Sequence, residues 1–306
     1  MSDNPKYFDV QVNGYAGVDF NQDGLSAEDF LRACRRLRAD GVESILATVI
    51  TDKIEAMQHR LKRLVQLREQ DSLGQETIYG IHIEGPFISA VPGYVGAHPP
   101  AAVRPATADD MEQLLAAAGG LTKIVTLAPE QDRGARVTKL LSDRGILVAA
   151  GHTDATIEQL KEAIDSGLSM FTHLGNGCPL QMHRHDNIVQ RVLSLADRLW
   201  ISFIADGAHI PFPALGNYLR CAGFERSLIV TDAISAAGLG PGTYAVGSQT
   251  VNIGDDLVPW ADDRTHFVGS ATIMSRADRN LRDCVGLSHS QVEQLTYHNP
   301  RRLLEG

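Results

Sequence analysis

The stretch TKIVTLAPEQDRGARVTKLLSDRGILVAAGH, residues 122–152, contains the unit that decides the fold. A short apolar run at 122–129 is followed by a segment with helical periodicity at 132–144 and by a second apolar run at 145–152. Short apolar runs bounded by turn residues predict buried strands, and a helix between two of them is typical of a parallel sheet. We therefore interpret this stretch as one strand–helix–strand unit.

The same unit recurs along the whole chain. Eight runs have the character of buried strands, and they lie at 7–14, 43–50, 77–85, 122–129, 145–152, 168–175, 199–207 and 227–233. Segments with helical periodicity lie between most of them, at 26–40, 52–70, 107–118, 132–144, 154–166 and 211–222. Eight such units predict an α/β fold, the closed (β/α)8 TIM-type barrel. A doubly wound open sheet is the rival fold, and it is disfavoured because no GxGxxG turn follows the first run.

The length of 306 residues, with no linker or internal repeat in the sequence, predicts one barrel domain, residues 1–306. Residues 238–268 are rich in Gly, Pro and Asp, and their short alternating stretches predict a hairpin-like insertion beside the active site. We expect helices at 271–286 and 290–304 to close the chain.

The composition argues against several classes of partner. Lys and Arg number 28 against 37 for Asp and Glu, and the net charge of −9 disfavours binding to nucleic acid or to an anionic membrane. No apolar run approaches the roughly 20 residues that span a bilayer, and the N-terminus lacks a signal-peptide pattern. The four cysteines show no CxxC spacing, which favours free thiols in a reducing compartment. We expect a cytoplasmic protein.

Polar residues follow four of the predicted strands at the point where each strand ends. Catalytic groups of such barrels lie at these carboxyl ends, and here they are Glu84, His152, His173 and Asp232. Each one alone has an ordinary structural explanation, as a hydrogen-bonded histidine, a helix cap or a turn residue. Together, two imidazoles and two carboxylates on one face of a barrel are the groups of a metal site with a base.

The residue types indicate the chemistry. Zinc binds neutral imidazole nitrogen and carboxylate oxygen, and a catalytic zinc site uses three protein ligands and leaves one position for water. Glu84, His152 and His173 supply three ligands, and Asp232 is the carboxylate that takes and returns a proton. The pattern predicts one divalent metal ion, with Zn2+ as the first choice and Fe2+, Co2+ or Mn2+ as alternatives for the same ligands.

Eight segments, in order along the whole chain, resemble the N-acetylglucosamine-6-phosphate deacetylase family of the amidohydrolase superfamily. They are DVQVNGYAGVDFN (9–21), GIHIEGPF (80–87), GAHPP (96–100), GHTDAT (151–156), THLGN (172–176), DGAHI (206–210), LIVTDAISAAG (228–238) and GSATIM (269–274). The resemblance implies that Glu84, His152 and His173 hold the metal and that Asp232 acts as general base and then as general acid. It implies that His98 helps to polarise the amide carbonyl.

The first predicted strand differs from that of many amidohydrolases. Gln11 and Asn13 stand where many of those enzymes have a metal-binding HxH pair, which implies a single metal beside a vacant second-metal pocket. His82 shares a face of its strand with Glu84 and is a candidate fourth ligand, with a structural role as the favoured alternative.

The resemblance also implies a set of groups that bind the sugar phosphate. Arg184 lies in a compact basic segment of an otherwise acidic protein, and its planar guanidinium suits phosphate, although a solvated basic loop is the alternative interpretation. The full set of implied substrate-binding residues is Asn176, Gly177, Arg184, His209, Phe267, Val268 and Gly269.

Two features depart from the family pattern. Relatives carry a small β-sandwich built from segments before and after the barrel, and from this comparison we expect a barrel-only relative with no separate β-sandwich domain. The stretch HLGNGCP at 173–179 stands where relatives have HLYNAMP, which places Gly175 and Cys178 beside the expected pocket and predicts a change in substrate size.

Three functions stay open at this stage. The first is a metal-dependent hydrolase that removes acetate from an N-acetyl amino-sugar phosphate, with N-acetylglucosamine 6-phosphate as the expected substrate. The second is an amidohydrolase that acts on a different N-acyl or cyclic amide substrate. The third is a non-catalytic sugar-phosphate binding protein, which a metal-type set of ligands argues against. The expected partner is a small amino-sugar phosphate, and the frequent dimers of the family suggest a homodimer.

Overall fold

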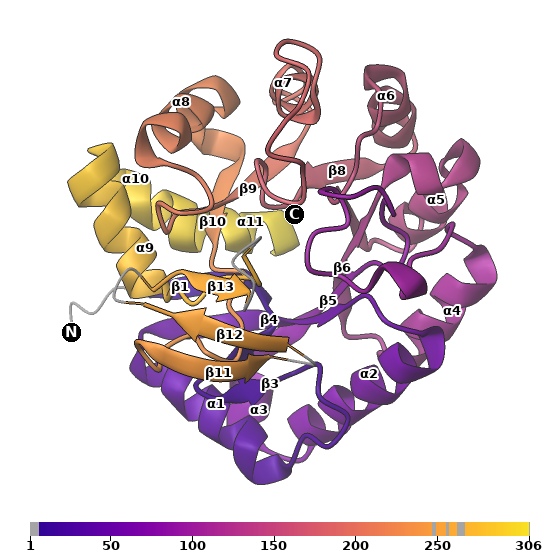
Figure 1. Ribbon diagram of the computed structural model, residues 1–306. Coiled ribbons are helices and arrows are strands. Elements are labelled where there is room, and N and C mark those ends of the chain that lie inside the picture. The colour runs from indigo at the N-terminus through magenta and orange to yellow at the C-terminus, as the bar shows by residue number, and fades with distance from the viewer. Residues whose placement is uncertain (1–5, 247–248, 255–256, 262–266, 306) are drawn as a thin grey trace.

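A closed parallel barrel forms the body of the protein (Figure 1). The computed structural model describes residues 6–246, 249–254, 257–261 and 267–305. Its main sheet has eight parallel strands, in the order β1-β4-β5-β6-β7-β8-β9-β10. The sheet closes between its first and last strands through a parallel bridge from Val12 to Ala233. The predicted (β/α)8 barrel is therefore confirmed. The strands are β1 (Tyr7–Val12), β4 (Val42–Ile50), β5 (Ile78–Glu84), β6 (Thr122–Leu127), β7 (Leu147–Ala150), β8 (Leu168–Phe171), β9 (Trp200–Ile204) and β10 (Ser227–Val230).

Helices surround the barrel, as Figure 1 shows. They are α1 (Ala27–Ala39), α2 (Ile54–Glu69), α3 (Ser72–Thr77), α4 (Ala108–Ala117), α5 (Arg136–Ser142), α6 (Ile157–Asp165), α7 (Ile188–Leu193), α8 (Phe212–Ala222), α9 (Met274–Asn280), α10 (His289–Glu293) and α11 (Asn299–Glu305). None of the described helices is long and apolar enough to cross a membrane.

Local capping fixes where several helices begin. The side chain of Ser26 accepts a hydrogen bond from the backbone N–H of Asp29 at the start of α1. Thr156 and Gln159 form a reciprocal capping box at the start of α6. Because the first N–H groups of a helix have no partner within the helix, such caps define the end of each strand-to-helix loop.

The core has two main parts. The larger part lies between the strands and the surrounding helices. The second fills the barrel interior with side chains such as Val10, Leu46 and Met170, and Leu303 of α11 packs against it. The interior is therefore closed at the end of the barrel that faces α11.

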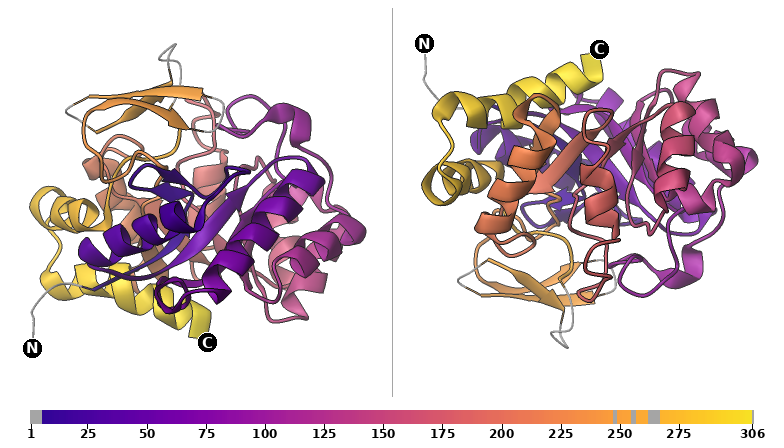
Figure 2. Two further views of the ribbon diagram at one scale, coloured as in Figure 1. Left: turned by 90° about the horizontal axis from the view of Figure 1, so that it is seen from below. Right: turned by 90° about the horizontal axis from the view of Figure 1, so that it is seen from above.

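A small antiparallel sheet lies at the opposite end of the barrel from α11 (Figure 2). It consists of β11 (Gly242–Val246), β12 (Gln249–Ile253) and β13 (Pro259–Ala261), which fall within the predicted insertion at 238–268. Positions 247–248, 255–256 and 262–266 of that insertion lie outside the described residues. Its apolar residues Val251 and Ile253 pack with Ile234, Val268 and Ala97.

Asp9 links the first and last strands at the point of closure. Its buried carboxylate accepts hydrogen bonds from the backbone N–H of Gln11 at 3.2 Å and from the backbone N–H and hydroxyl of Thr231 at 3.2 and 2.5 Å. Burial raises the pKa of Asp9 to about 7, although the contacts with Thr231 and Gln11 act in the opposite direction. The folded protein therefore holds a proton on Asp9 more tightly than the unfolded chain does.

We expect Asp9 to make the protein less stable as the pH rises. A raised pKa in the folded state removes stability between the unfolded value of 3.8 and the folded value of about 7. Asp9→Asn should remove a slope of about 1 kcal/mol per pH unit from the free energy of unfolding in this window, measured by urea unfolding from pH 4 to 7. Thr231→Ala keeps the acid and should keep the slope. Equal slopes for Asp9→Asn and the wild type would contradict this explanation.

Candidate metal centre and active site

The predicted functional residues occupy equivalent places at the carboxyl ends of strands. Glu84 is the last residue of β5, while His152, His173 and Asp232 each lie two residues beyond the end of β7, β8 or β10. The φ angles of these three residues are 51°, 33° and 51°. Positive φ is uncommon for residues other than glycine, and such conformations concentrate at functional sites. The backbone therefore supports the interpretation drawn from the sequence.

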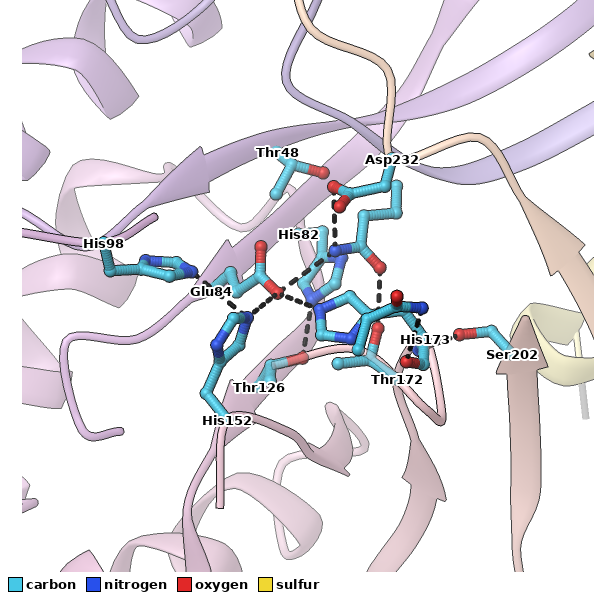
Figure 3. A network of polar contacts seen from close by, with 12 residues as sticks. Thr48, His82, Glu84, His98, Thr126, His152, Thr172, His173, Ser202 and Asp232 are labelled. Atoms are coloured by element: carbon cyan, nitrogen blue, oxygen red, sulfur yellow. Dashed lines mark hydrogen bonds and ion pairs between the residues drawn. The ribbon is translucent and has the colours of Figure 1, made fainter. Parts of the chain in front are cut away.

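Glu84 lies at the centre of the cluster (Figure 3). Its buried Oε1 is 2.9 Å from Nε2 of His173 and 3.4 Å from Nε2 of His152, and it accepts a hydrogen bond from Nε2 of Gln11 at 3.1 Å. Burial alone would raise the pKa of Glu84, but the contacts with His152 and His173 outweigh it and hold this pKa well below its usual range. Glu84 is therefore a carboxylate.

His152 is held in one orientation. Its Nδ1 lies 2.9 Å from the carbonyl oxygen of Tyr94, which can only accept a hydrogen bond, so Nδ1 carries a proton. In the neutral ring Nε2 then keeps its lone pair, and this atom faces Glu84 and, at 3.2 Å, Nε2 of His98. A backbone carbonyl that fixes the outer nitrogen of a histidine is the usual support of a metal ligand.

The donor atoms of this cluster fit a divalent metal ion. Glu84, His98 and His152 bring three ligand atoms within 4.8 Å of one another, and His173 approaches the same oxygen of Glu84. Among the described residues, Nδ1 of His98 and Nδ1 of His173 are buried without a hydrogen-bond partner. Several buried imidazoles around one carboxylate are costly without a cation, and zinc prefers these ligand types. His98 thus lies beside the three ligands predicted from the sequence.

Asp232 is positioned by two amide side chains. Its Oδ1 accepts hydrogen bonds from Nδ2 of Asn13 at 2.7 Å and from Nε2 of Gln11 at 3.2 Å. Burial and the nearby charge of Glu84 raise the pKa of Asp232. Gln11 is itself fixed, because its Oε1 accepts a hydrogen bond from the hydroxyl of Thr172 at 2.6 Å. The side-chain N–H groups of Gln11 thus donate to Glu84 and Asp232, and those of Asn13 donate to Asp232.

His82 has a different environment from the other histidines of the cluster. Its Nδ1 is 3.1 Å from the carbonyl oxygen of Val10, and its Nε2 is 2.8 Å from the hydroxyl of Thr126. Burial lowers the pKa of His82 to about 4, so the ring is neutral. Because both nitrogens have partners, the structure favours the structural role over the role of fourth ligand.

Two of the residues implied in substrate binding lie directly on the metal-type cluster. The backbone N–H of Asn176 donates to the carbonyl oxygen of His173 at 2.9 Å, and its side-chain amide donates to the same oxygen at 3.1 Å. Gly177 has a φ of 57°, and a Cβ at this position would lie 2.7 Å from Nδ1 of His152. Only glycine fits so close to the ring.

Apart from Arg184, the remaining residues of the implied substrate set come from two other loops. Nδ1 of His209 is 2.6 Å from a carboxylate oxygen of Asp206, and the rings of His209 and Phe267 meet in an edge-type contact with centroids 5.1 Å apart. Val268 is buried, and a Cβ at Gly269 would lie 3.4 Å from the carbonyl oxygen of Asp232. These residues therefore surround the turn that carries Asp232.

Arg184 takes no part in these contacts. It is exposed, and it makes no hydrogen bond or ion pair with the described part of the chain. Its role in phosphate binding stays a prediction, as do the roles of the other implied residues.

Sequence reasoning missed Asp206 and Thr172. Asp206 lies in the segment DGAHI, and its place two residues beyond β9 is equivalent to that of His173 beyond β8. Thr172 directly precedes His173 and holds Gln11. A search for polar residues two positions beyond every strand would have found Asp206.

A closed parallel barrel whose strand ends bring together metal-type ligands and an acid defines a metal-dependent hydrolase of the amidohydrolase kind. Comparison with known proteins agrees. The chain is 35% identical over 313 residues to N-acetylglucosamine-6-phosphate deacetylase of Bos taurus, with 98% of this chain and 74% of the relative covered. It is 31% identical over 300 residues to N-acetylgalactosamine-6-phosphate deacetylase of Escherichia coli O157:H7, with 98% and 77% covered. The chain belongs to the N-acetylglucosamine-6-phosphate deacetylase family.

A solved structure agrees with these sequence comparisons. The N-acetyl-D-glucosamine-6-phosphate deacetylase of Mycobacterium smegmatis, as a variant in complex with N-acetyl-D-glucosamine-6-phosphate, superposes with a TM-score of 0.88 at 27% identity. The match covers 98% of this chain and 77% of that one. No protein-family model matches the chain.

The central position of Glu84 predicts that it controls metal binding. Glu84→Gln removes the negative charge of the cluster and should weaken zinc binding at least about 100-fold, measured by competition with a fluorescent chelator. His209→Gln changes a histidine outside the cluster and should leave the zinc affinity unchanged. Wild-type affinity in Glu84→Gln would show that the ion binds elsewhere.

Proposed function

We propose that this protein removes acetate from an N-acetyl amino-sugar phosphate, with N-acetylglucosamine 6-phosphate as the substrate and zinc as the metal. Membership of the deacetylase family supports the reaction, and the relatives' names support the substrate. The observation that carries the proposal is the contact of Gln11 with both Glu84 and Asp232, because one side chain joins the metal-type cluster to the acid. In the reaction water adds to the amide carbonyl carbon, the C–N bond breaks, and acetate and an amine leave.

Glu84, His152 and His173 are the side chains that would hold the metal, with His98 beside them. A divalent ion bound there lowers the pKa of water and polarises a carbonyl group. The outer contact from Tyr94 to His152 keeps that imidazole aimed at the cluster. The same donor types also suit Fe2+, Co2+ and Mn2+.

Asp232 moves the proton in the proposed reaction. Its carboxylate takes a proton from the attacking water and returns it to the leaving nitrogen, which would otherwise depart as an unstable anion. A raised pKa suits this double role, because the carboxylate then takes up a proton more readily. Asn13 and Gln11 hold the carboxylate in one orientation through their hydrogen bonds.

His98 is suited to polarise the amide carbonyl. Burial, followed by the neighbouring His152, lowers the pKa of His98 to about 3, so the ring is neutral and has one N–H donor. A fixed donor that faces the developing oxyanion is typically worth about 2.7–4 kcal/mol in the transition state. His98 therefore supports the reaction as a hydrogen-bond donor or as an additional ligand.

The sugar phosphate is proposed to lie among the residues that surround the cluster. Asn176 and Gly177 cover the metal side, while His209 and the segment 267–269 cover the side of Asp232. Arg184 would approach the phosphate from its exposed loop. A homodimer and a cytoplasmic location stay predictions from the sequence.

N-acetylgalactosamine 6-phosphate is a second candidate substrate. The relative from Escherichia coli O157:H7 is named for N-acetylgalactosamine 6-phosphate, which is the epimer of the proposed substrate. Acetate release from both phosphates, from the unphosphorylated sugars and from other N-acyl or cyclic amides would identify the substrate. Binding of the sugar phosphates without acetate release from any compound by the zinc-loaded protein would leave the non-catalytic binder as the better explanation.

The assignment of Asp232 predicts a variant that binds metal but does not turn over. Asp232→Asn cannot take a proton and should lower kcat by about 100- to 10,000-fold with the zinc content unchanged. Asp132→Asn is a matched control, since Asp132 is also a buried carboxylate, but within the described part of the chain its side chain bonds only to the backbone of Val137 and Thr138. Wild-type turnover in Asp232→Asn would remove this residue from the mechanism.

The proposed role of Arg184 predicts an effect that depends on phosphate. Arg184→Ala should raise KM for N-acetylglucosamine 6-phosphate by about 10- to 100-fold, because a charge-assisted hydrogen bond is lost. Turnover of unphosphorylated N-acetylglucosamine should not change. Arg198→Ala removes an exposed arginine that pairs with Asp165 and serves as the control. An equal loss for both sugars would contradict phosphate recognition by Arg184.

A further inference from the structure

The carboxylate of Asp206 makes contacts with two separate parts of the chain, its own turn and Ser270. Its Oδ1 accepts hydrogen bonds from the backbone N–H groups of Ala208 and His209, both at 2.9 Å. Its Oδ2 lies 2.6 Å from Nδ1 of His209 and 3.4 Å from the hydroxyl of Ser270. Only 6% of the Asp206 side chain is exposed. Both oxygens of this carboxylate therefore accept hydrogen bonds. Oδ1 caps the turn at 206–209, and Oδ2 contacts two side chains.

The contact with Asp206 determines the state of the His209 ring. Burial alone would raise the pKa of Asp206, but the contact with His209 and the backbone N–H groups outweigh it, so this pKa is lowered and the group is a carboxylate. A carboxylate can only accept a hydrogen bond, so Nδ1 of His209 carries a proton. Nε2, on the other side of the ring, has no partner among the described residues. This nitrogen is the one left to meet a ligand.

The position of the His209 ring is fixed from a second direction. The Phe267 ring lies against it in an edge-type contact, and Trp260 of β13 lies against Phe267 with ring centroids 4.5 Å apart. The His209 ring is therefore held between the Asp206 carboxylate and the Phe267 ring.

Ser270 connects the same carboxylate to the turn that carries Asp232. Its hydroxyl contacts Asp206, while its backbone N–H donates to the carbonyl oxygen of Asp232 at 3.1 Å. The carbonyl oxygen of Ser270 accepts from the backbone N–H of Ile234 at 3.0 Å. One buried carboxylate thus contacts both a group implied in substrate binding and the backbone support of the proposed base.

We propose that Asp206 is a positioning residue, which holds His209 with Nδ1 protonated and Nε2 turned toward the substrate and which steadies the Asp232 turn through Ser270. The inference rests on the proposed deacetylase function for its kinetic consequences. The state of the His209 ring follows from the contacts alone.

Asp206→Asn tests this assignment with little change in shape. The remaining oxygen can still accept from the backbone of Ala208 and His209, but the new NH2 group faces Nδ1 of His209 and favours the tautomer with the proton on Nε2. We expect kcat/KM for N-acetylglucosamine 6-phosphate to fall by about 10- to 100-fold, as for other outer contacts that orient an active-site histidine. Asp132→Asn, a buried carboxylate outside the site, should keep the wild-type kcat/KM.

A double-mutant cycle separates positioning from a general loss of structure. In the background of His209→Gln, adding Asp206→Asn should change kcat/KM less than about threefold. The ring is then gone, and the new amide can keep the contact with Ser270, because the Ser270 hydroxyl both donates and accepts. Effects that multiply in full would show that Asp206 does not act through His209. A wild-type rate in Asp206→Asn would overturn the proposal directly.

Nitrogen NMR of the histidine rings provides a readout that needs no turnover. The His209 signal, assigned by its loss in His209→Gln, should show a protonated Nδ1 in the wild type and a protonated Nε2 in Asp206→Asn at a pH where the ring is neutral. The same tautomer in both proteins would refute the proposal. If the wild type released no acetate from any sugar, the proposed function would fail, whereas this spectrum would still decide the role of Asp206.

Discussion

Oε1 of Glu84 lies within 3.4 Å of nitrogen atoms from three separate parts of the chain, His152, His173 and Gln11. Such crowding around one buried oxygen is stable only when the oxygen is charged and the nitrogens either donate to it or share a cation with it. The rest of the site follows from this point. Gln11 also donates to Asp232, and His152 also contacts His98. The hydroxyl of Thr172 holds Gln11, and the carbonyl oxygen of Tyr94 holds His152.

The barrel makes this convergence geometrically simple. β7, β8, β9 and β10 each place a functional candidate two residues beyond their ends, and three of the four residues adopt positive φ. Closure of the sheet between Val12 and Ala233 then brings the first and last strands together, so that Asn13 meets Asp232. An open sheet would leave these two residues at opposite edges. The strain of the turns is therefore supported by a rigid, closed scaffold.

Much of this architecture could be predicted from the sequence, because parallel strands are buried on both faces and read as continuous apolar runs. All eight strands were identified in this way. Helix α7 was missed, since six residues give too short a pattern, and the helix expected at 132–144 is α-helical only from Arg136. The four strand-end residues could be found because their side chains differ so clearly from the runs before them. The contact of Asp206 with His209 could not, because it depends on a side-chain orientation within a loop rather than on periodicity.

The most direct test of the account is a crystal structure with zinc, in which anomalous scattering locates the ion. We expect one strong peak bound by Glu84, His152 and His173, with His98 and Asp232 facing it and a free position open to solvent. A peak bound by other residues, or a cluster in which these side chains point away from one another in the presence of zinc, would contradict it.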